Sequence, residues 1–172
     1  MCNFIYLGNI LSEEQKRLIR KNINCERDVA LYENGWIDMA ESIGLEKSKE
    51  YKELVSILPE HFRMDKEMSL IEIVRFIDVQ KHIDDEYSDW ILAVFVELSS
   101  LDNEWRFCIE SESGEVLKKK VSKWDVIAFR QKDYHWVESD SSKKRMMQGS
   151  LKVKELINTS VALLFNIKAP KM

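Results

Sequence analysis

Glycine and proline are scarce in this sequence, with five and two residues among 172. This scarcity argues against flexible linkers and extended disorder, because such segments are enriched in these residues. The sequence also lacks an apolar run of about 18 residues, so it predicts no membrane-spanning helix. Its first residues have no basic start and run into a charged helix, unlike a secretory signal peptide. We therefore expect a cytoplasmic protein.

Cysteine and histidine are equally rare, with three residues of each type. Cys2, Cys25 and Cys108 form no Cys-x-x-Cys pair, and their odd number fits free thiols in a reducing compartment better than a disulfide framework. The formal charge of −4 argues against a nucleic-acid partner, because phosphate contacts need clustered Lys and Arg. Nothing in the sequence indicates an oligomeric state.

Helical patterns come first along the chain, and β-branched and aromatic runs follow. The expected helices span residues 12–23, 36–44 and 49–60, and Ser12 with Gln15 forms a capping box at the first. A short strand and turn are expected at 3–11, and further strands at 70–77, 90–98, 105–111, 115–121, 124–130, 134–138 and 159–167, with a hairpin turn at 111–115. This order predicts one α+β domain over 1–172, with a mainly helical support at 1–68 and a β-sandwich or barrel at 69–172.

The scarce histidines narrow the search for a chemical site. His82 lies two residues before Asp84 at the end of a predicted strand, where residues i and i+2 point to the same face. An imidazole beside a carboxylate is half of a metal site. Two histidines and one carboxylate with open positions form the facial arrangement of non-haem Fe(II) sites.

Either His61 or His135 would supply the second histidine. His135 fits better because it opens a predicted strand after a buried one, whereas His61 follows Pro59 in a connection. Simpler interpretations remain open for both halves of this site. Residues 82–89 would also suit an acidic surface loop, and His135, between two aromatic residues, would also suit a packed core position.

Taken in order, these segments resemble the Fe(II)/2-oxoglutarate-dependent oxygenases, in particular their prolyl-hydroxylase-like branch. Residues 6–19 resemble the opening strand, turn and helix of that family, and 71–84 resemble the strand leading into its His-x-Asp pair. Residues 90–99 resemble the next core strand, and 104–139 the hairpin, buried strand and distal histidine. The resemblance implies a double-stranded β-helix, or jelly roll, with helices packed on one side. It also implies that His82, Asp84 and His135 are the iron ligands.

The same resemblance implies that 2-oxoglutarate chelates the iron and that a basic residue about ten positions after the distal histidine holds its far carboxylate. Arg145 stands ten residues after His135, although it would also suit a solvated Lys-Lys-Arg run. The strand at 159–167, in contrast, starts without a basic residue. If residues 139–156 are an insertion, Arg106 or Arg75 is the alternative anchor, because both lie on predicted core strands.

Glycines that are common at two turns of the family are replaced here by 78–79 and 123–124, which indicates a divergent member. The resemblance implies an Fe(II)- and 2-oxoglutarate-dependent dioxygenase that hydroxylates a peptide or protein side chain or a small molecule. The alternative is a catalytically inactive jelly-roll module that has lost the cosubstrate site and binds a ligand or partner.

Overall fold

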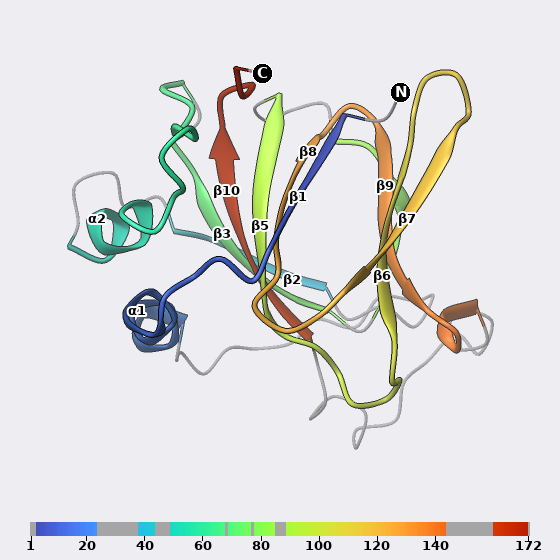
Figure 1. Cartoon of the computed structure of the whole chain (residues 1–172), viewed down its shortest axis with the longest axis horizontal. Coiled ribbons are helices and arrows are strands. Elements are labelled where there is room, and N and C mark those ends of the chain that lie inside the picture. Colours follow the sequence, from blue (N-terminus) through green and yellow to red (C-terminus); the bar gives the residue numbers. More distant parts are fainter. Residues whose placement is uncertain are drawn as a thin grey trace.

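The computed structural model describes residues 3–23, 38–43, 49–67, 69–76, 78–84, 89–143 and 160–171. Within these ranges ten strands form two antiparallel sheets, and two helices lie on the outer side of the larger sheet (Figure 1). The elements in chain order are β1 (Phe4–Gly8), α1 (Glu13–Ile23), β2 (Asp38–Ile43), α2 (Lys49–Val55), β3 (Ile71–Phe76), β4 (Val79–His82), β5 (Trp90–Glu97), β6 (Trp105–Glu110), β7 (Val116–Val121), β8 (Val126–Arg130), β9 (Tyr134–Ser139) and β10 (Ser160–Ile167). This is a double-stranded β-helix, as predicted.

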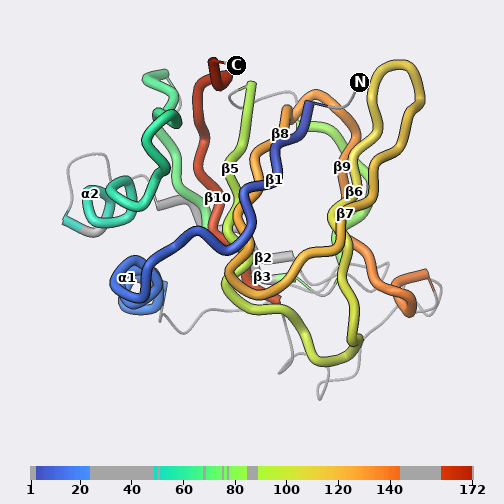
Figure 2. Tube along the Cα trace, in the orientation of Figure 1, coloured from blue at the N-terminus to red at the C-terminus, as the bar shows by residue number. Residues whose placement is uncertain are grey.

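The two sheets interleave distant parts of the chain. The larger sheet has the order β1-β8-β5-β10-β3-β2, and the smaller has the order β4-β9-β6-β7. Figure 2 shows the C-terminal strand β10 between β3 and β5, where Leu163 pairs with Ile73 on one side and Val94 on the other. In the smaller sheet, β4 and β9 bring His82 opposite His135.

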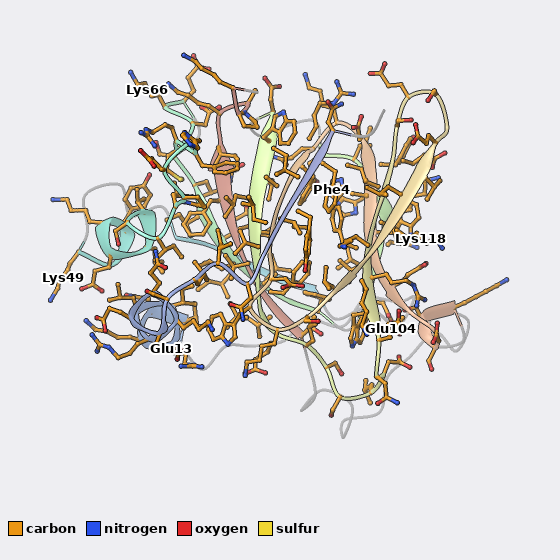
Figure 3. All side chains as sticks on the ribbon, viewed as in Figure 1. Phe4, Glu13, Lys49, Lys66, Glu104 and Lys118 are labelled. Carbon is orange, nitrogen blue, oxygen red and sulfur yellow. The ribbon has the colours of Figure 1, made fainter. Side chains whose placement is uncertain are left out.

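Two apolar cores hold these layers together. One lies between the helices and the larger sheet and includes Ile19 of α1 and Leu54 of α2, both fully buried. The other lies between the sheets and includes Phe107. In Figure 3, Phe4 lies between the sheets, where its ring stacks on Phe107, whereas Lys118 lies on the outer side of the smaller sheet. Strand β5 contributes to both cores, which explains its nearly continuous apolar sequence.

The first helix begins as the sequence predicts. The backbone N–H of Ser12 donates to Gln15 Oε1 at 2.8 Å, and the N–H of Gln15 donates to Ser12 Oγ at 3.1 Å. This reciprocal capping box satisfies two backbone donors that have no partner inside the helix. Helix α2 lies within the predicted range 49–60. Neither helix of the described ranges is long and apolar enough to cross a lipid bilayer.

The predicted helix at 36–44 was wrong, because residues Asp38–Ile43 form strand β2 and pair antiparallel with β3. The apolar spacing of this segment suits a helix, but the edge of β3 offers backbone partners along its whole length. Such tertiary pairing outweighs weak local propensity. Strand β1, in contrast, lies within residues 3–11, where the sequence predicts a short strand and turn, and it forms one edge of the larger sheet.

Two turns need a left-handed residue. Gly114, in the predicted hairpin turn, has φ of 85°, and Trp124, before β8, has φ of 73°. A non-glycine residue in this conformation is strained by roughly 1–2 kcal/mol. Trp124 compensates through burial, since its side chain is nearly enclosed and lies beneath the cations of Lys16 and Arg20 of α1. Trp124, which stands where glycine is common in the family, therefore packs against α1 and holds this helix on the barrel.

Candidate metal centre

The structure brings His82, Asp84 and His135 together at one end of the barrel. His82 is the last residue of β4, and His135 is the second residue of β9, opposite it in the sheet. Asp84 lies beyond the end of β4, so it does not share a strand face with His82 as predicted. Its backbone N–H instead donates to the carbonyl of Gln131 at 3.2 Å. His61, the alternative histidine, is exposed in a turn and does not line this site.

Asp84 lies close enough to both histidines to share a cation with each of them. Asp84 Oδ2 lies 3.4 Å from His135 Nε2 and 3.6 Å from His82 Nε2, and one donor atom from each residue lies within 4.8 Å of the others. Two donors bound to one metal at about 2.1 Å can be at most about 4.2 Å apart. Both contacts of Asp84 are inside that limit, and the donor set suits a first-row transition metal.

Backbone carbonyls orient both imidazole rings. His82 Nδ1 lies 2.6 Å from the carbonyl of Gln80, and His135 Nδ1 lies 2.9 Å from the carbonyl of Asp133. A carbonyl oxygen can only accept, so in the neutral ring the proton is on Nδ1 and the lone pair is on Nε2. Each Nε2 faces Asp84. This is the outer-shell arrangement that fixes the tautomer of metal-binding histidines.

Electrostatics favour the charged form of Asp84. Burial by itself would raise the pKa of this carboxyl group, but the hydrogen bonds and charge that the rings of His135 and His82 supply when they are protonated lower it by more. The pKa of Asp84 therefore lies well below its usual range, and the carboxylate is ionised at neutral pH. An ionised carboxylate is the form that binds a cation.

A cavity of about 490 Å³ between the sheets is lined by these three side chains. Most of its wall is apolar, from Val74, Phe76, Val79, Ile91, Ala93, Phe95, Phe107, Ile127, Phe129, Val137, Ala162 and Leu164. Polar groups join the wall at Glu72, Asp78, Gln80, Gln131 and Asn166. A largely apolar cavity of this volume with a few convergent polar groups is typical of small-ligand sites.

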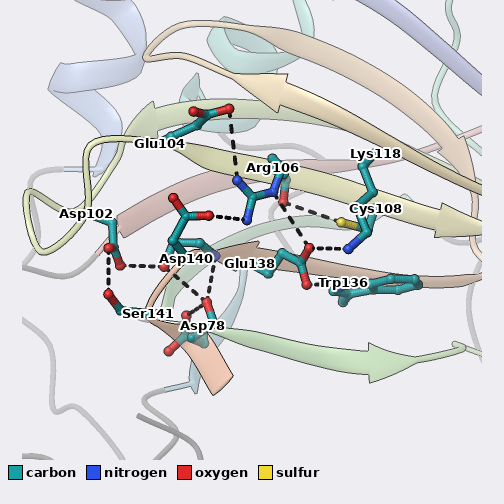
Figure 4. Close-up of polar contacts among 12 residues, drawn as sticks. Asp78, Asp102, Glu104, Arg106, Cys108, Lys118, Trp136, Glu138, Asp140 and Ser141 are labelled. Carbon is teal, nitrogen blue, oxygen red and sulfur yellow. Dashed lines mark hydrogen bonds and ion pairs between the residues drawn. The ribbon is translucent and has the colours of Figure 1, made fainter. Parts of the chain in front are cut away.

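The predicted anchors for a carboxylate lie elsewhere or outside the described residues. Arg106 projects from the outer face of the smaller sheet, whereas its neighbour Phe107 lines the cavity. Its guanidinium contacts Asp140 at 2.9 Å and Glu138 at 3.7 Å (Figure 4). Arg106, an alternative anchor because it lies on a core strand, therefore points away from the cavity, where acidic neighbours on the outer face pair with it.

The other two arginines cannot be placed against the cavity in the same way. Arg145 lies outside the described residues. Arg75 belongs to β3, but its side chain is also outside the described part of the structure.

Sequence reasoning missed two buried amides beside the triad. Gln131 and Asn166 are almost fully buried, and Gln131 Nε2 donates to Asn166 Oδ1 at 3.3 Å. Asn166 Nδ2 in turn donates to the carbonyl of Leu70 at 3.1 Å. The signal was present, since Asn166 interrupts an otherwise apolar strand and a buried amide needs a partner.

Comparisons with known proteins support the fold. No family model matches the chain. No curated protein matches it either. Among solved structures, a Pseudomonas putida prolyl-4-hydroxylase superposes with a TM-score of 0.58 at 9% identity, over 98% of this chain and 93% of that one.

Two further structures cover nearly all of the chain. A Trichoplax adhaerens prolyl hydroxylase, in complex with a peptide fragment of the hypoxia inducible factor oxygen degradation domain, has a TM-score of 0.59 at 10% identity, over 96% of this chain and 84% of that one. HygX from Streptomyces hygroscopicus, with nickel and 2-oxoglutarate bound, has a TM-score of 0.53 at 9% identity, over 99% of this chain and 84% of that one. The chain therefore has the double-stranded β-helix fold of the Fe(II)/2-oxoglutarate-dependent oxygenases.

Proposed function

We propose that this protein is an Fe(II)- and 2-oxoglutarate-dependent dioxygenase of the hydroxylase type, with His82, Asp84 and His135 as its metal ligands. The observation that supports this most strongly is the convergence of two imidazoles and one ionised carboxylate on a cavity in this fold. Such a donor set leaves coordination positions open. Fe(II) and 2-oxoglutarate, when bound, supply the oxidation of a C–H bond.

The protein contributes binding, orientation and exclusion of water. Asp84 offers a charged carboxylate, and the two Nδ1 contacts keep the Nε2 atoms of His82 and His135 available as donors. The apolar wall keeps water from the reacting groups. Gln131 and Asn166 supply hydrogen-bonding groups at the metal end of the cavity.

The far carboxylate of the cosubstrate needs a cationic partner. Apart from the histidines, the charged residues among the described part of the cavity wall are acidic: Glu72, Asp78 and Asp84. We therefore propose that the anchor comes from outside that part of the wall and keep Arg145 as first candidate, with Arg75 as second. A bidentate arginine suits a carboxylate well.

The substrate we propose is a peptide or protein side chain or a small molecule. The Trichoplax neighbour, which holds a peptide fragment, supports the first of these classes. The two adjoining cores support a single domain over 1–172. The buried free thiol of Cys108 is consistent with a reducing, cytoplasmic location.

Anaerobic titration with Fe(II), with and without 2-oxoglutarate, tests the proposal. We expect a weak visible charge-transfer band from the chelated complex in the wild type. The band should disappear in His135→Ala and in Arg145→Ala. Arg106→Ala is the matched control, because Arg106 lies on the outer face, and it should keep the band.

The outcomes separate the assignments. Loss of the band in His135→Ala alone would move the carboxylate anchor to Arg75. Absence of the band in the wild type, with no iron retained, would contradict the oxygenase proposal.

An inactive jelly-roll binding module is the second candidate function. The carboxylates of Glu72 and Asp78 in the cavity wall favour it, because they would repel a dianionic cosubstrate. His82→Ala distinguishes the two candidates: an oxygenase would lose turnover while remaining folded, whereas a binding module would keep its binding function.

A further inference from the structure

One turn of the chain supports two of the three triad residues. The turn between β8 and β9, residues 131–133, presents two backbone carbonyls to the site. The carbonyl of Gln131 accepts the N–H of Asp84 at 3.2 Å, and the carbonyl of Asp133 lies 2.9 Å from His135 Nδ1. The orientation of the two metal-binding residues, Asp84 and His135, therefore depends on the conformation of this β8–β9 turn.

A buried carboxylate holds the turn in place. The Asp133 side chain has no exposed surface. Its Oδ1 accepts hydrogen bonds from Nε (3.2 Å) and Nη2 of Arg130, and its Oδ2 accepts one from Asn3 Nδ2 at 3.3 Å. The carbonyl of Asn3 also accepts the N–H of Arg130 at 3.0 Å. These contacts join Asp133, Arg130 at the end of β8 and Asn3 into one hydrogen-bonded cluster, which we call the clamp.

A buried charge of this kind needs a reason. Moving a carboxylate out of water is unfavourable, and an ion pair often does no more than offset that loss. A neutral side chain could close a short turn without it. The clamp nevertheless ties Asp133 to Arg130, and the two carbonyls that contact Asp84 and His135 belong to Gln131, which lies between these residues, and to Asp133 itself.

We propose that Asp133 is a positioning residue of the metal centre, which, clamped by Arg130 and Asn3, fixes the two carbonyls that orient Asp84 and His135. This inference rests on the proposed metal-binding function. Outer-shell partners of metal ligands typically change metal affinity 10- to 100-fold when removed. The Asp133 side chain acts less directly, because it fixes the backbone of the turn whose carbonyls contact Asp84 and His135.

The test compares Asp133→Ala and Asp133→Asn with Glu112→Gln in the full-length chain. Glu112 is the exposed partner of Arg130 at 3.2 Å. Its replacement removes a negative charge beside the same arginine but keeps every contact of Asp133. Three quantities are measured: the affinity for Co(II), the visible d–d spectrum of the Co(II) complex, and thermal unfolding of the metal-free protein. The ¹⁵N resonances of the His135 ring report its tautomer in the absence of metal.

We expect Asp133→Ala to bind Co(II) about 10- to 100-fold more weakly than the wild type, with an altered d–d spectrum. Asp133→Asn keeps one acceptor oxygen for Arg130, so its affinity for Co(II) should lie between those of the wild type and Asp133→Ala. Glu112→Gln should match the wild type in affinity, spectrum and tautomer. Because Asp133→Ala removes a buried group and could unfold, Asp133→Asn carries the comparison in that case.

A variant that unfolds at lower temperature but binds Co(II) with wild-type affinity and spectrum would show a purely structural role and overturn the inference. Unchanged His135 resonances in Asp133→Asn, together with unchanged affinity, would also overturn it while leaving the proposed function standing. Failure of the wild type itself to bind Co(II) would overturn the proposed function and this inference together.

Discussion

Replacing Ala162 with leucine tests whether the cavity between the sheets is open in the folded protein. Ala162 lies on β10, is 4% exposed and lines that cavity of about 490 Å³. Ala128 on β8 offers a matched control. It is fully buried, but it belongs to the close-packed core between the larger sheet and the helices.

The two substitutions add the same three carbon atoms in different surroundings. Burying each added carbon contributes about 0.8 kcal/mol where space exists, or roughly 2 kcal/mol in all. Where no space exists, overpacking destabilises by about 1–3 kcal/mol. We therefore expect Ala162→Leu to leave the free energy of unfolding unchanged or raise it by up to roughly 2 kcal/mol, and Ala128→Leu to lower it by about 1–3 kcal/mol.

Thermal unfolding followed by circular dichroism measures the difference, at about 2–4 °C for each kcal/mol in a chain of this size. Ala162→Leu should also weaken 2-oxoglutarate binding while leaving the affinity for Fe(II) near that of the wild type, because Ala162 belongs to the larger sheet, whereas His82 and His135 belong to the smaller one. Equal destabilisation by both substitutions would refute the reasoning, since it would mean that the space beside Ala162 is filled.

Three further predictions concern single groups. In a Cys2→Ser/Cys25→Ser background, Cys108 should not react with an aromatic disulfide reagent at pH 8 until the protein is unfolded. Burial, and to a smaller extent the charge of Glu138, raises the pKa of this thiol to about 12. Rapid reaction of the native protein would contradict this. Ser12→Ala should lower the free energy of unfolding in urea by about 1 kcal/mol through loss of the capping box, whereas Ser12→Asp should retain most of it. The pKa of Asp84 is lowered in the folded state, so its carboxylate stabilises the fold fully above pH about 4 and progressively less as the pH falls. On acidification, the free energy of unfolding of metal-free Asp84→Asn should therefore fall less than that of the wild type. Urea unfolding curves that change identically with pH in both proteins would contradict this.

Strands β5, β6, β8 and β10 could be predicted because their sequences are mostly buried. Strand β5 is apolar from Trp90 to Val96, since helices cover one face and the smaller sheet the other. The capping box at Ser12 was equally local, because it depends on two residues of one turn. Segment 36–44 was misassigned because its state depends on the edge of β3, which the local sequence does not contain.

The candidate site was predictable in its members but not in its geometry. The scarcity of histidine singled out His82 and His135, yet Asp84 reaches them from beyond the end of β4 through a contact to Gln131. Arg106 stayed an alternative anchor because alternation along a strand does not tell which face is the interior. Its direction is settled only when the acidic side chains of the neighbouring strand and loop are in place.

The position of β10 has a consequence for how this protein is made. It follows all the other described strands in chain order, yet it lies between β3 and β5. During synthesis from the N-terminus, both of these strands keep an unpaired edge until residues 160–167 have left the ribosome. Pairings between such distant segments form slowly, and unpaired edges invite association between chains. We expect the nascent protein to depend on protection from aggregation until its final strand closes the larger sheet.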